Sequence, residues 1–212
     1  MLQSLGRSGR DAGTVDTVWL WPTMALVLGY LLGAIPFGLL LTRISGAGDL
    51  RQVGSGNIGA TNVLRTGRKG LAAATLLLDV AKGAVAVIAA RAINPDYAVL
   101  GAAGAFLGHC YPVWLRFRGG KGIATYGGIA LAIAWPVGLI YAAVWVAMLA
   151  LTRFSSAAGV AAAASAPVAS AWLGQFEATA LFIAFTLIVL WKHRANVERL
   201  MAGTEPRVGQ PG

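Results

Sequence analysis

The chain has 212 residues, of which 57% are apolar and only 12% are charged, and its mean hydropathy is +0.68. Soluble domains carry about 25% charged residues, so this composition excludes a soluble domain with an ordinary charged surface. The net charge of +9 does not indicate nucleic acid, because the basic residues lie between apolar segments, where membrane loops and anionic partners explain them better. Cys110 is the single cysteine, which excludes an intrachain disulfide, and we expect it to be a small packing residue.

Long apolar stretches predict an all-α integral membrane protein, because several approach or exceed the roughly 18 mostly apolar residues of a membrane span. A polar extension over residues 1–18, expected to be flexible, precedes a single membrane-embedded domain over 19–207 and a flexible tail over 208–212. Seven transmembrane helices are predicted, at roughly 19–42, 71–91, 97–113, 123–135, 137–152, 156–173 and 176–191. The fourth is short for a full span.

Seven spans place the two termini on opposite sides of the membrane, and the basic residues predict which side is which. The loops on one side of the membrane hold nearly all of the basic residues. The short loops on the other side hold only Arg91, together with the acidic residues Asp96 and Glu177. Because basic loops face the cytoplasm, the N-terminus is predicted outside and the C-terminus in the cytoplasm. The basic set is Arg43, Arg51, Arg65, Arg68, Lys69, Arg116, Arg118, Lys121, Arg153, Lys192, Arg194, Arg199 and Arg207.

The first polar segment, "GSGNIGATNVLRTGRKG" over residues 54–70, is too polar to span and too rich in glycine for a stable helix. Its glycines allow backbone N–H groups to turn toward a ligand. A solvated basic loop would not need the Ser-Gly-Asn and Ala-Thr-Asn runs, so we favour a binding role. Hydrogen bonds would come from Ser55, Asn57, Thr61 and Asn62, and positive charge from Arg65, Arg68 and Lys69.

The second polar segment, "GHCYPVWLRFRGGKGIAT" over residues 108–125, has the composition of a phosphate cradle. Glycines before a helix can point free N–H groups at an anion, and the helix dipole adds to this effect. Lys121 adds a point charge. The chain has no G-x-x-x-x-G-K-[ST] run, which excludes a Walker nucleotide loop. His109, which ends the third span, is either a functional group or a histidine that bonds a neighbouring backbone group.

The third polar segment, "WKHRANVERLMAGTEPRVG" over residues 191–209, places His193, Asn196 and Arg199 along one edge of a helix. The alternative is a basic tail that touches anionic lipid.

Asp79 and Lys82 lie within the second span at i, i+3 spacing. Because charges in a membrane are costly and usually pair, we expect these two residues to form a structural pair under the site.

Together these motifs resemble the acyl-phosphate:glycerol-3-phosphate acyltransferase family of bacterial membranes. The family pattern S-G-N-x-G-A-T-N-x-x-R matches Ser55 to Arg65, and G-H-x-x-P with F-x-G-G-K-G-x-A-T matches 108–112 with 117–125. The final H-x-x-N-x-x-R with a following glutamate matches His193, Asn196, Arg199 and Glu205. The resemblance covers roughly residues 20–207.

The resemblance implies transfer of an acyl chain from acyl phosphate to the 1-hydroxyl of sn-glycerol 3-phosphate, giving lysophosphatidic acid and phosphate. It implies no metal, no other cofactor, no nucleic acid, and no need for acyl carrier protein or coenzyme A at the site. The catalytic residues would be Ser55, Arg65, His109, His193 and Asn196. The phosphate ligands would be Asn57, Asn62, Arg68, Gly119, Gly120, Lys121, Gly122 and Thr125. The structural supports would be Asp79, Lys82 and Glu205.

The chemistry of acyl phosphate needs no covalent acyl-enzyme, because this mixed anhydride already carries a good leaving group. We expect Ser55 to hydrogen-bond phosphate rather than attack, and Asn196 or a backbone N–H to face the oxyanion. His193, His109 or a substrate phosphate oxygen would take the hydroxyl proton. Two other classes stay open: a transporter of a phosphorylated solute, and a scaffold that only binds anionic lipid.

Overall fold

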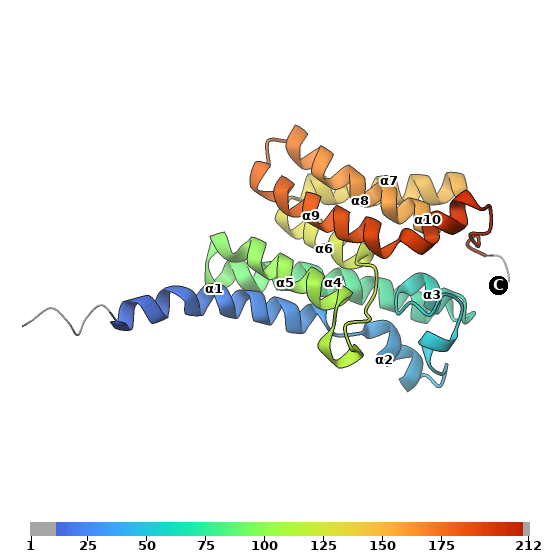
Figure 1. Ribbon diagram of the computed structural model, residues 1–212, viewed down its shortest axis with the longest axis horizontal. Helices are drawn as coiled ribbons and strands as arrows, with labels where there is room; N and C mark the ends of the chain where they lie inside the picture. The colour runs from blue at the N-terminus through green and yellow to red at the C-terminus, as the bar shows by residue number, and fades with distance from the viewer. Residues whose placement is uncertain (1–11, 210–212) are drawn as a thin grey trace, which may run out of the picture.

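The computed structural model describes residues 12–209, and this part of the chain folds into ten α-helices joined by short connections (Figure 1). Three 3₁₀ turns lie in the connections, η1 (Leu50–Gln52), η2 (Pro95–Tyr97) and η3 (Val113–Leu115). The helices are α1 (Ala12–Gly33), α2 (Phe37–Ile44), α3 (Ala60–Leu64), α4 (Lys69–Ile93), α5 (Ala98–Cys110), α6 (Ile123–Ile133), α7 (Trp135–Thr152), α8 (Ser155–Trp172), α9 (Phe176–Lys192) and α10 (Arg194–Met201).

Each predicted span corresponds to a helix, but the first one is broken. Helix α1 ends at Gly33 and α2 begins at Phe37. Pro36 lies between them, where its ring disfavours helical geometry at Ile35 and where it has no N–H to donate. The extension predicted over residues 1–18 overlaps this helix, because α1 begins at Ala12; residues 1–11 lie outside the described part.

In the described part of the chain, fewer helices have the length and composition of a membrane span than the seven that the sequence predicts. Within residues 12–209, four helical segments are long and apolar enough to cross a membrane, and the bent pair α9 and α10 would make a fifth. Helix α6 has only 11 residues, about half the length of a full span. The seven-span count and the orientation of the termini therefore stay predictions.

The helices form two layers that run roughly parallel to one another (Figure 1). Helices α1, α4 and α5 make one layer, and α6, α7, α8 and α9 make the other, with α4 packed on α6 between them. Small residues allow this close packing, as is common in membrane bundles. A Cβ atom at Gly104 would overlap the Leu26 carbonyl of α1, and one at Gly128 would overlap the Val80 carbonyl of α4.

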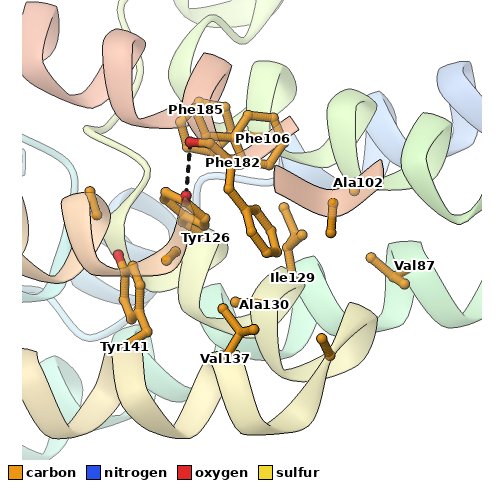
Figure 2. Close-up of a cluster of buried hydrophobic side chains, with 14 of the residues drawn as sticks. Val87, Ala102, Phe106, Tyr126, Ile129, Ala130, Val137, Tyr141, Phe182 and Phe185 are labelled. Carbon is orange, nitrogen blue, oxygen red and sulfur yellow. Dashed lines mark hydrogen bonds between the residues drawn. The ribbon is translucent and has the colours of Figure 1, made fainter. Parts of the chain in front are cut away.

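The core between the layers is built around aromatic rings (Figure 2). Phe106 of α5 stacks on Phe185 of α9, with ring centroids 4.0 Å apart, and both rings contact Tyr126 of α6. The Tyr126 hydroxyl donates to the Phe182 carbonyl at 2.9 Å, which satisfies its polar end inside an apolar core. These contacts tie the short helix α6 to α5 and α9, and so fix where its N-terminus lies.

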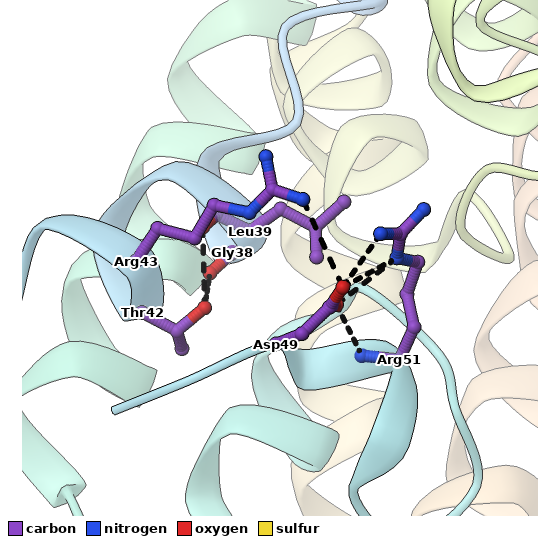
Figure 3. A network of polar contacts seen from close by, with 6 residues as sticks. All are labelled: Gly38, Leu39, Thr42, Arg43, Asp49 and Arg51. Carbon is purple, nitrogen blue, oxygen red and sulfur yellow. Dashed lines mark hydrogen bonds and ion pairs between the residues drawn. The ribbon is translucent and has the colours of Figure 1, made fainter. Parts of the chain in front are cut away.

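A polar network holds the connection between α2 and α3 (Figure 3). Asp49 accepts hydrogen bonds from the Arg51 side chain and from the Arg51 backbone N–H, and Arg43 approaches the same carboxylate at 3.7 Å. The hydrogen-bonded Arg51 guanidinium holds the pKa of Asp49 well below its ordinary value. Asp49 thereby neutralises part of the charge where two basic residues meet.

Candidate functional site

A cavity of about 570 Å³ is lined in part by residues of α3 and α10. These two helices lie at the same end of the bundle (Figure 1). Its walls come from the α2–α3 connection, α3, the start of α6, the start of α8, α10 and the segment after α10. The three polar segments of the sequence therefore meet at one place. The predicted site residues that line the cavity are Ser55, Asn57, Asn62, Arg65, Asp79, His109, Lys121, Gly122, His193, Asn196 and Glu205.

A chain of buried polar contacts runs along one wall of this cavity. The Lys121 ammonium donates to the Asn196 side-chain oxygen, and the Asn196 amide donates to Glu205 Oε1 at 2.7 Å. Ser156 donates to the same Glu205 oxygen at 2.6 Å, and Arg199 donates to Oε2 at 2.7 Å. Glu205 thus anchors α8 and α10 together and, through Asn196, fixes the Lys121 ammonium. Its predicted structural role fits these contacts.

The polar contacts along this wall determine the charge states of Lys121 and Glu205. Burial lowers the pKa of Lys121 to about 8, with Glu205 opposing this shift and nearby Arg199 and Arg65 adding to it. Burial alone would raise the pKa of Glu205, but the hydrogen bonds from Ser156, Asn196 and Arg199 outweigh burial and hold this pKa below its ordinary value. At neutral pH the cavity wall therefore presents an ammonium supported by a carboxylate.

The glycines before α6 do not present their amides as the sequence suggested. The Gly119 N–H donates to the Cys110 carbonyl at 3.2 Å, and the Gly120 N–H donates to the His109 carbonyl at 3.0 Å. Both amides therefore have backbone acceptors in this structure, and phosphate binding through them is not supported. A Cβ atom at Gly120 would overlap the His109 ring, so glycine is needed here for close approach to that ring.

The free amides lie one step later, at the start of α6. Gly122 caps the helix with φ 86°, a left-handed conformation that glycine adopts easily. Within residues 12–209, the N–H groups of Ile123 and Ala124 have no hydrogen-bond acceptor, as is usual for the first turn of a helix. Both residues line the cavity next to Lys121. This helix N-terminus and the Lys121 ammonium can bind an anion together.

Asn62 supports a loop and does not present a free amide to the cavity. Its Nδ2 donates to the Leu50 and Val53 carbonyls at 3.0 and 2.9 Å, and its Oδ1 accepts from the Ser55 N–H at 3.2 Å. Both amide hydrogens of Asn62 are therefore used by backbone carbonyls, and neither is free to bind phosphate as the sequence predicts. Asn57 accepts from the Gly59 N–H at 2.9 Å, and within residues 12–209 its Nδ2 has no partner.

Ser55 lacks the partner that a nucleophile requires. Its hydroxyl donates weakly to Asn62 Oδ1, at 3.4 Å, and the side chain is exposed. A nucleophilic serine is activated by a general base within hydrogen-bond reach. Within the described residues, neither histidine contacts Ser55, so the hydroxyl is suited to hydrogen-bond a ligand.

Three charged or titratable side chains lie beneath the cavity. Asp79 and Lys82 form a buried ion pair at 2.7 Å, and Lys82 also donates to the Ile35 carbonyl at the α1–α2 break. This is the structural pair that the sequence predicts. His109 Nδ1 lies 3.8 Å from Asp79 Oδ1, beyond hydrogen-bond distance. Asp79 and His109 line the cavity floor, whereas Lys82 does not.

His193 is buried in the cavity wall with one ring nitrogen occupied. Its Nδ1 lies 2.8 Å from the Val189 carbonyl, which fixes the tautomer because a carbonyl can only accept a hydrogen bond. The neutral ring therefore donates from Nδ1 and leaves Nε2 as an acceptor. Burial, aided by the Lys121 charge, lowers the pKa of His193 to about 4. The imidazole is neutral at physiological pH.

Two predicted phosphate ligands lie away from the cavity. Arg68 is exposed and donates to the Ser45 carbonyl at 2.8 Å, and Thr125 is fully buried inside α6. Neither lines the cavity, so neither prediction is supported. Among residues 12–209, no group of three or more His, Cys, Asp or Glu side chains could hold a metal ion.

The sequence missed the role of the segment after α10. Arg207, Val208 and Gly209 line the cavity, and the Val208 N–H donates to the Arg153 carbonyl at 2.8 Å while Arg153 donates back at 3.0 Å. The tail predicted over 208–212 thus begins with two residues that line the cavity, Val208 and Gly209; residues 210–212 lie outside the described part.

The chain is similar to members of a known protein family. Residues 23–203 match the family described as glycerol-3-phosphate acyltransferase. A relative of that name from Mesorhizobium japonicum is 58% identical over 189 residues, covering 89% of this chain and 97% of the relative. One from Ruegeria pomeroyi is 57% identical over 196 residues, covering 92% and 97%.

Two solved structures are also similar. Both are crystal structures of PlsY, an integral membrane glycerol 3-phosphate acyltransferase. The glycerol 3-phosphate form gives a TM-score of 0.84 at 34% identity, covering 89% of this chain and 96% of that one. The lysophosphatidic acid form gives 0.81 at 32% identity, covering 88% and 94%.

Proposed function

The chain belongs to the glycerol-3-phosphate acyltransferase family of integral membrane enzymes, and from this premise we propose its donor, its products and its mechanism. The donor is acyl phosphate, and the acyl chain passes directly to the 1-hydroxyl of sn-glycerol 3-phosphate. The products are lysophosphatidic acid and inorganic phosphate. The reaction takes place at the cytoplasmic face of a bacterial inner membrane, where the basic loops are expected to lie.

One observation carries this proposal: the cavity joins the free N-terminus of α6 to the Lys121 ammonium and the Arg65 guanidinium at one end of an apolar bundle. Both substrates carry a phosphate group, and one also carries a long apolar chain. The names of the two solved relatives, a glycerol 3-phosphate form and a lysophosphatidic acid form, support binding of the same acceptor and product here.

The proposed reaction forms one bond and breaks one bond. The acceptor hydroxyl oxygen attacks the carbonyl carbon of the acyl phosphate, and the bond between that carbon and the phosphate oxygen then breaks. Arg65 is free to follow the departing phosphate, since its contact with Asn62 Oδ1 is long, at 3.5 Å. Holding both reactants in this geometry supplies much of the rate enhancement.

Direct transfer is supported by the surroundings of Ser55. Its hydroxyl points to an amide oxygen and not to a base, so the step that would form an acyl-enzyme has no evident activator.

The role proposed for Asn196 differs from the one expected from the sequence, in which Asn196 or a backbone N–H faces the oxyanion. Because Asn196 is bonded to Lys121 and Glu205, it positions the ammonium, and the α6 amides are better placed to face the oxyanion.

A phosphate oxygen of a substrate is the group best suited to accept the proton of the attacking hydroxyl. A general base works best when its pKa lies near the working pH. His193, with a pKa of about 4, is a weak base, whereas a phosphate monoester has a second pKa of about 6. The neutral His193 Nε2 can instead accept a hydrogen bond from the acceptor hydroxyl and orient it.

The test is an assay with purified protein in sealed vesicles that carry acyl phosphate, with labelled glycerol 3-phosphate added to the outside. We expect labelled lysophosphatidic acid. Label inside the vesicles without new lipid would indicate a transporter, and neither result would indicate a binding scaffold. Parallel reactions with acyl-coenzyme A and acyl carrier protein test the donor. Comparable turnover with either would contradict acyl phosphate as the specific donor.

A further inference from the structure

A second cavity, of about 480 Å³, lies between two connections that also carry parts of the active site. One wall is the α2–α3 connection, with Arg51 and Gly56. The other is the α5–α6 connection around η3, with Trp114, Leu115, Arg116 and Arg118. The two cavities share no lining residue within the described chain, so the second is a separate place in the fold.

The charge of this second cavity is strongly positive and mostly unpaired. Within residues 12–209, the guanidinium groups of Arg116 and Arg118 have no carboxylate partner and no hydrogen-bond acceptor. Arg51 is paired with Asp49 through its Nε and Nη2 atoms, which leaves Nη1 unbound. The cavity therefore offers several guanidinium donors to an anion, and guanidinium binds phosphate oxygens with good geometry.

The α5–α6 connection is rigidly held, so the arginines are positioned in advance. The Tyr30 hydroxyl of α1 donates to the Tyr111 carbonyl at 2.8 Å and accepts from the Val113 N–H at 2.9 Å. The Trp114 indole donates to the Ala34 carbonyl at 2.9 Å. A loop that served only to carry exposed charge would not need these contacts to the α1 helix.

The backbone of this connection is also strained at its centre. Arg116 and Phe117 have φ values of 51° and 60°, a left-handed conformation that side chains other than those of Gly, Asn and Asp adopt rarely. Such strain persists where the surrounding structure enforces it, and it occurs most often at functional sites. Here it turns the chain so that Arg116 and Arg118 both line the cavity.

Apolar side chains border the arginines and point to a membrane surface as the source of the anion. Val113, Trp114 and Phe117 are each about half exposed, at 51%, 48% and 58%. Trp is enriched where a membrane protein meets the lipid headgroups, and basic residues there attract anionic lipid. A phosphate group that reaches this place from the bilayer would bring its acyl chains against these side chains.

We propose that the cavity between Arg51, Arg116 and Arg118 binds the phosphate headgroup of an anionic phospholipid of the surrounding bilayer. The arginines contact the phosphate, and Val113, Trp114 and Phe117 contact the glycerol and upper acyl chains. This is a lipid site outside the catalytic cavity, and its occupant is a membrane component, not a substrate in turnover.

Photo-crosslinking in vesicles tests this assignment. The full chain is reconstituted in phosphatidylcholine with a trace of photoreactive phosphatidylglycerol, or with photoreactive phosphatidylcholine as the zwitterionic comparison. After illumination, labelled peptides are identified by mass spectrometry. We expect phosphatidylglycerol to label peptides that contain 113–118 several-fold more than phosphatidylcholine does. Equal labelling by the two lipids would overturn the proposal.

Arg118→Gln and Arg116→Gln test the residues, with Arg194→Gln as the matched control. Arg194 is exposed, and its guanidinium donates to the Trp191 carbonyl and lies over the Trp191 ring. Each of the three variants removes one positive charge. We expect each cavity variant to lower phosphatidylglycerol labelling about fivefold, the effect of losing one basic residue near an anionic surface, and the control to leave it unchanged.

Two outcomes would contradict the assignment. An equal loss in Arg194→Gln would mean that general positive charge attracts the lipid. Displacement of the lipid by inorganic phosphate at comparable concentration would mean that the cavity binds free phosphate and not a lipid headgroup. Acyl transfer measured in the same vesicles checks that each variant is folded, because none of the three arginines lines the catalytic cavity.

Discussion

The ammonium of Lys121 donates a hydrogen bond to the side-chain oxygen of Asn196, a residue 75 positions later in the chain. This contact joins the connection before α6 to helix α10. Because Asn196 is itself held by Glu205, these two residues together fix the positive charge of Lys121 in place.

The first prediction concerns this positioning. Asn196→Ala should free the Lys121 ammonium and lower kcat/KM for glycerol 3-phosphate on the order of 10²-fold, the cost of a misplaced catalytic group. Arg194→Ala, on the same helix but exposed, should leave kcat/KM within a factor of about two. Steady-state kinetics with acyl phosphate in detergent measure both. An Asn196→Ala enzyme with unchanged kcat/KM would show that Lys121 needs no such support.

The second prediction is a loss of activity at alkaline pH. Lys121, with a pKa lowered to about 8, is protonated below this pH and neutral above it, so phosphate binding should weaken as the pH rises through 8. The kcat/KM profile reports the free enzyme. Lys121→Arg should remove this alkaline decline, because arginine stays charged. A decline that persists in Lys121→Arg would assign it to another group.

A stability measurement separates this effect from unfolding. The pKa of Lys121 lies below its ordinary value of 10.5, so the fold disfavours the charged amine. The contribution of Lys121 to the free energy of unfolding should therefore rise between about pH 8 and pH 10.5, while activity falls. Thermal unfolding of the native enzyme against Lys121→Met over this range measures that contribution.

The third prediction addresses Ser55. Ser55→Ala removes one hydrogen bond to a ligand and should lower kcat by roughly 10- to 100-fold, within the range for a hydrogen bond to a charged group. A nucleophile would instead leave almost no activity. Rapid quenching with labelled acyl phosphate, followed by mass spectrometry, would reveal an acyl group on Ser55. Finding that adduct would rule out direct transfer.

The fourth prediction is a coupling between Gly120 and His109. A methyl group at Gly120 would overlap the His109 ring, so Gly120→Ala should lower both activity and thermal stability. In the double variant with His109→Ala the ring is gone, and the second substitution should cost little beyond His109→Ala alone. A double-mutant cycle measures this non-additivity. Strictly additive losses would place the Gly120 effect elsewhere.

The fifth prediction is the membrane orientation. Cysteines introduced at Met201 and Gln175, both exposed, should react from opposite sides: Met201→Cys from the cytoplasm and Gln175→Cys from outside. Cys110 is fully buried, so the native thiol gives no background labelling and can stay. An impermeant maleimide on intact cells distinguishes the two. Labelling of Met201→Cys in sealed cells would invert the predicted topology.

The helices could be predicted from the sequence because each long apolar stretch buries one face in the bundle or in lipid. The predictions failed for local features, such as helix boundaries, that depend on single backbone contacts. Pro36 breaks the first span, and α1 extends back to Ala12 through residues of mixed polarity. Composition gives no measure of where such a helix begins.

The polar segments that form the site could also be predicted, but not the role of each residue within them. Asn62 and the Gly119 and Gly120 amides have the right chemistry for phosphate, yet all of them bond to nearby carbonyls. Lys121 and Asn196 were both identified, but their contact was not, because no local pattern links positions so far apart. Arg207 was identified only as a basic loop residue, because it lies outside the three motifs that indicated the site.

The position of Glu205 has a consequence for how the enzyme is made. Its carboxylate holds Ser156, Asn196 and Arg199 together, and it comes later in the chain than all of the helices α1–α10. During synthesis, all ten helices can therefore form before the Lys121 wall of the cavity is complete. We expect a growing chain that has not yet released Glu205 from the ribosome to hold an unfinished site, and to gain acyltransferase activity only after translation has passed this residue.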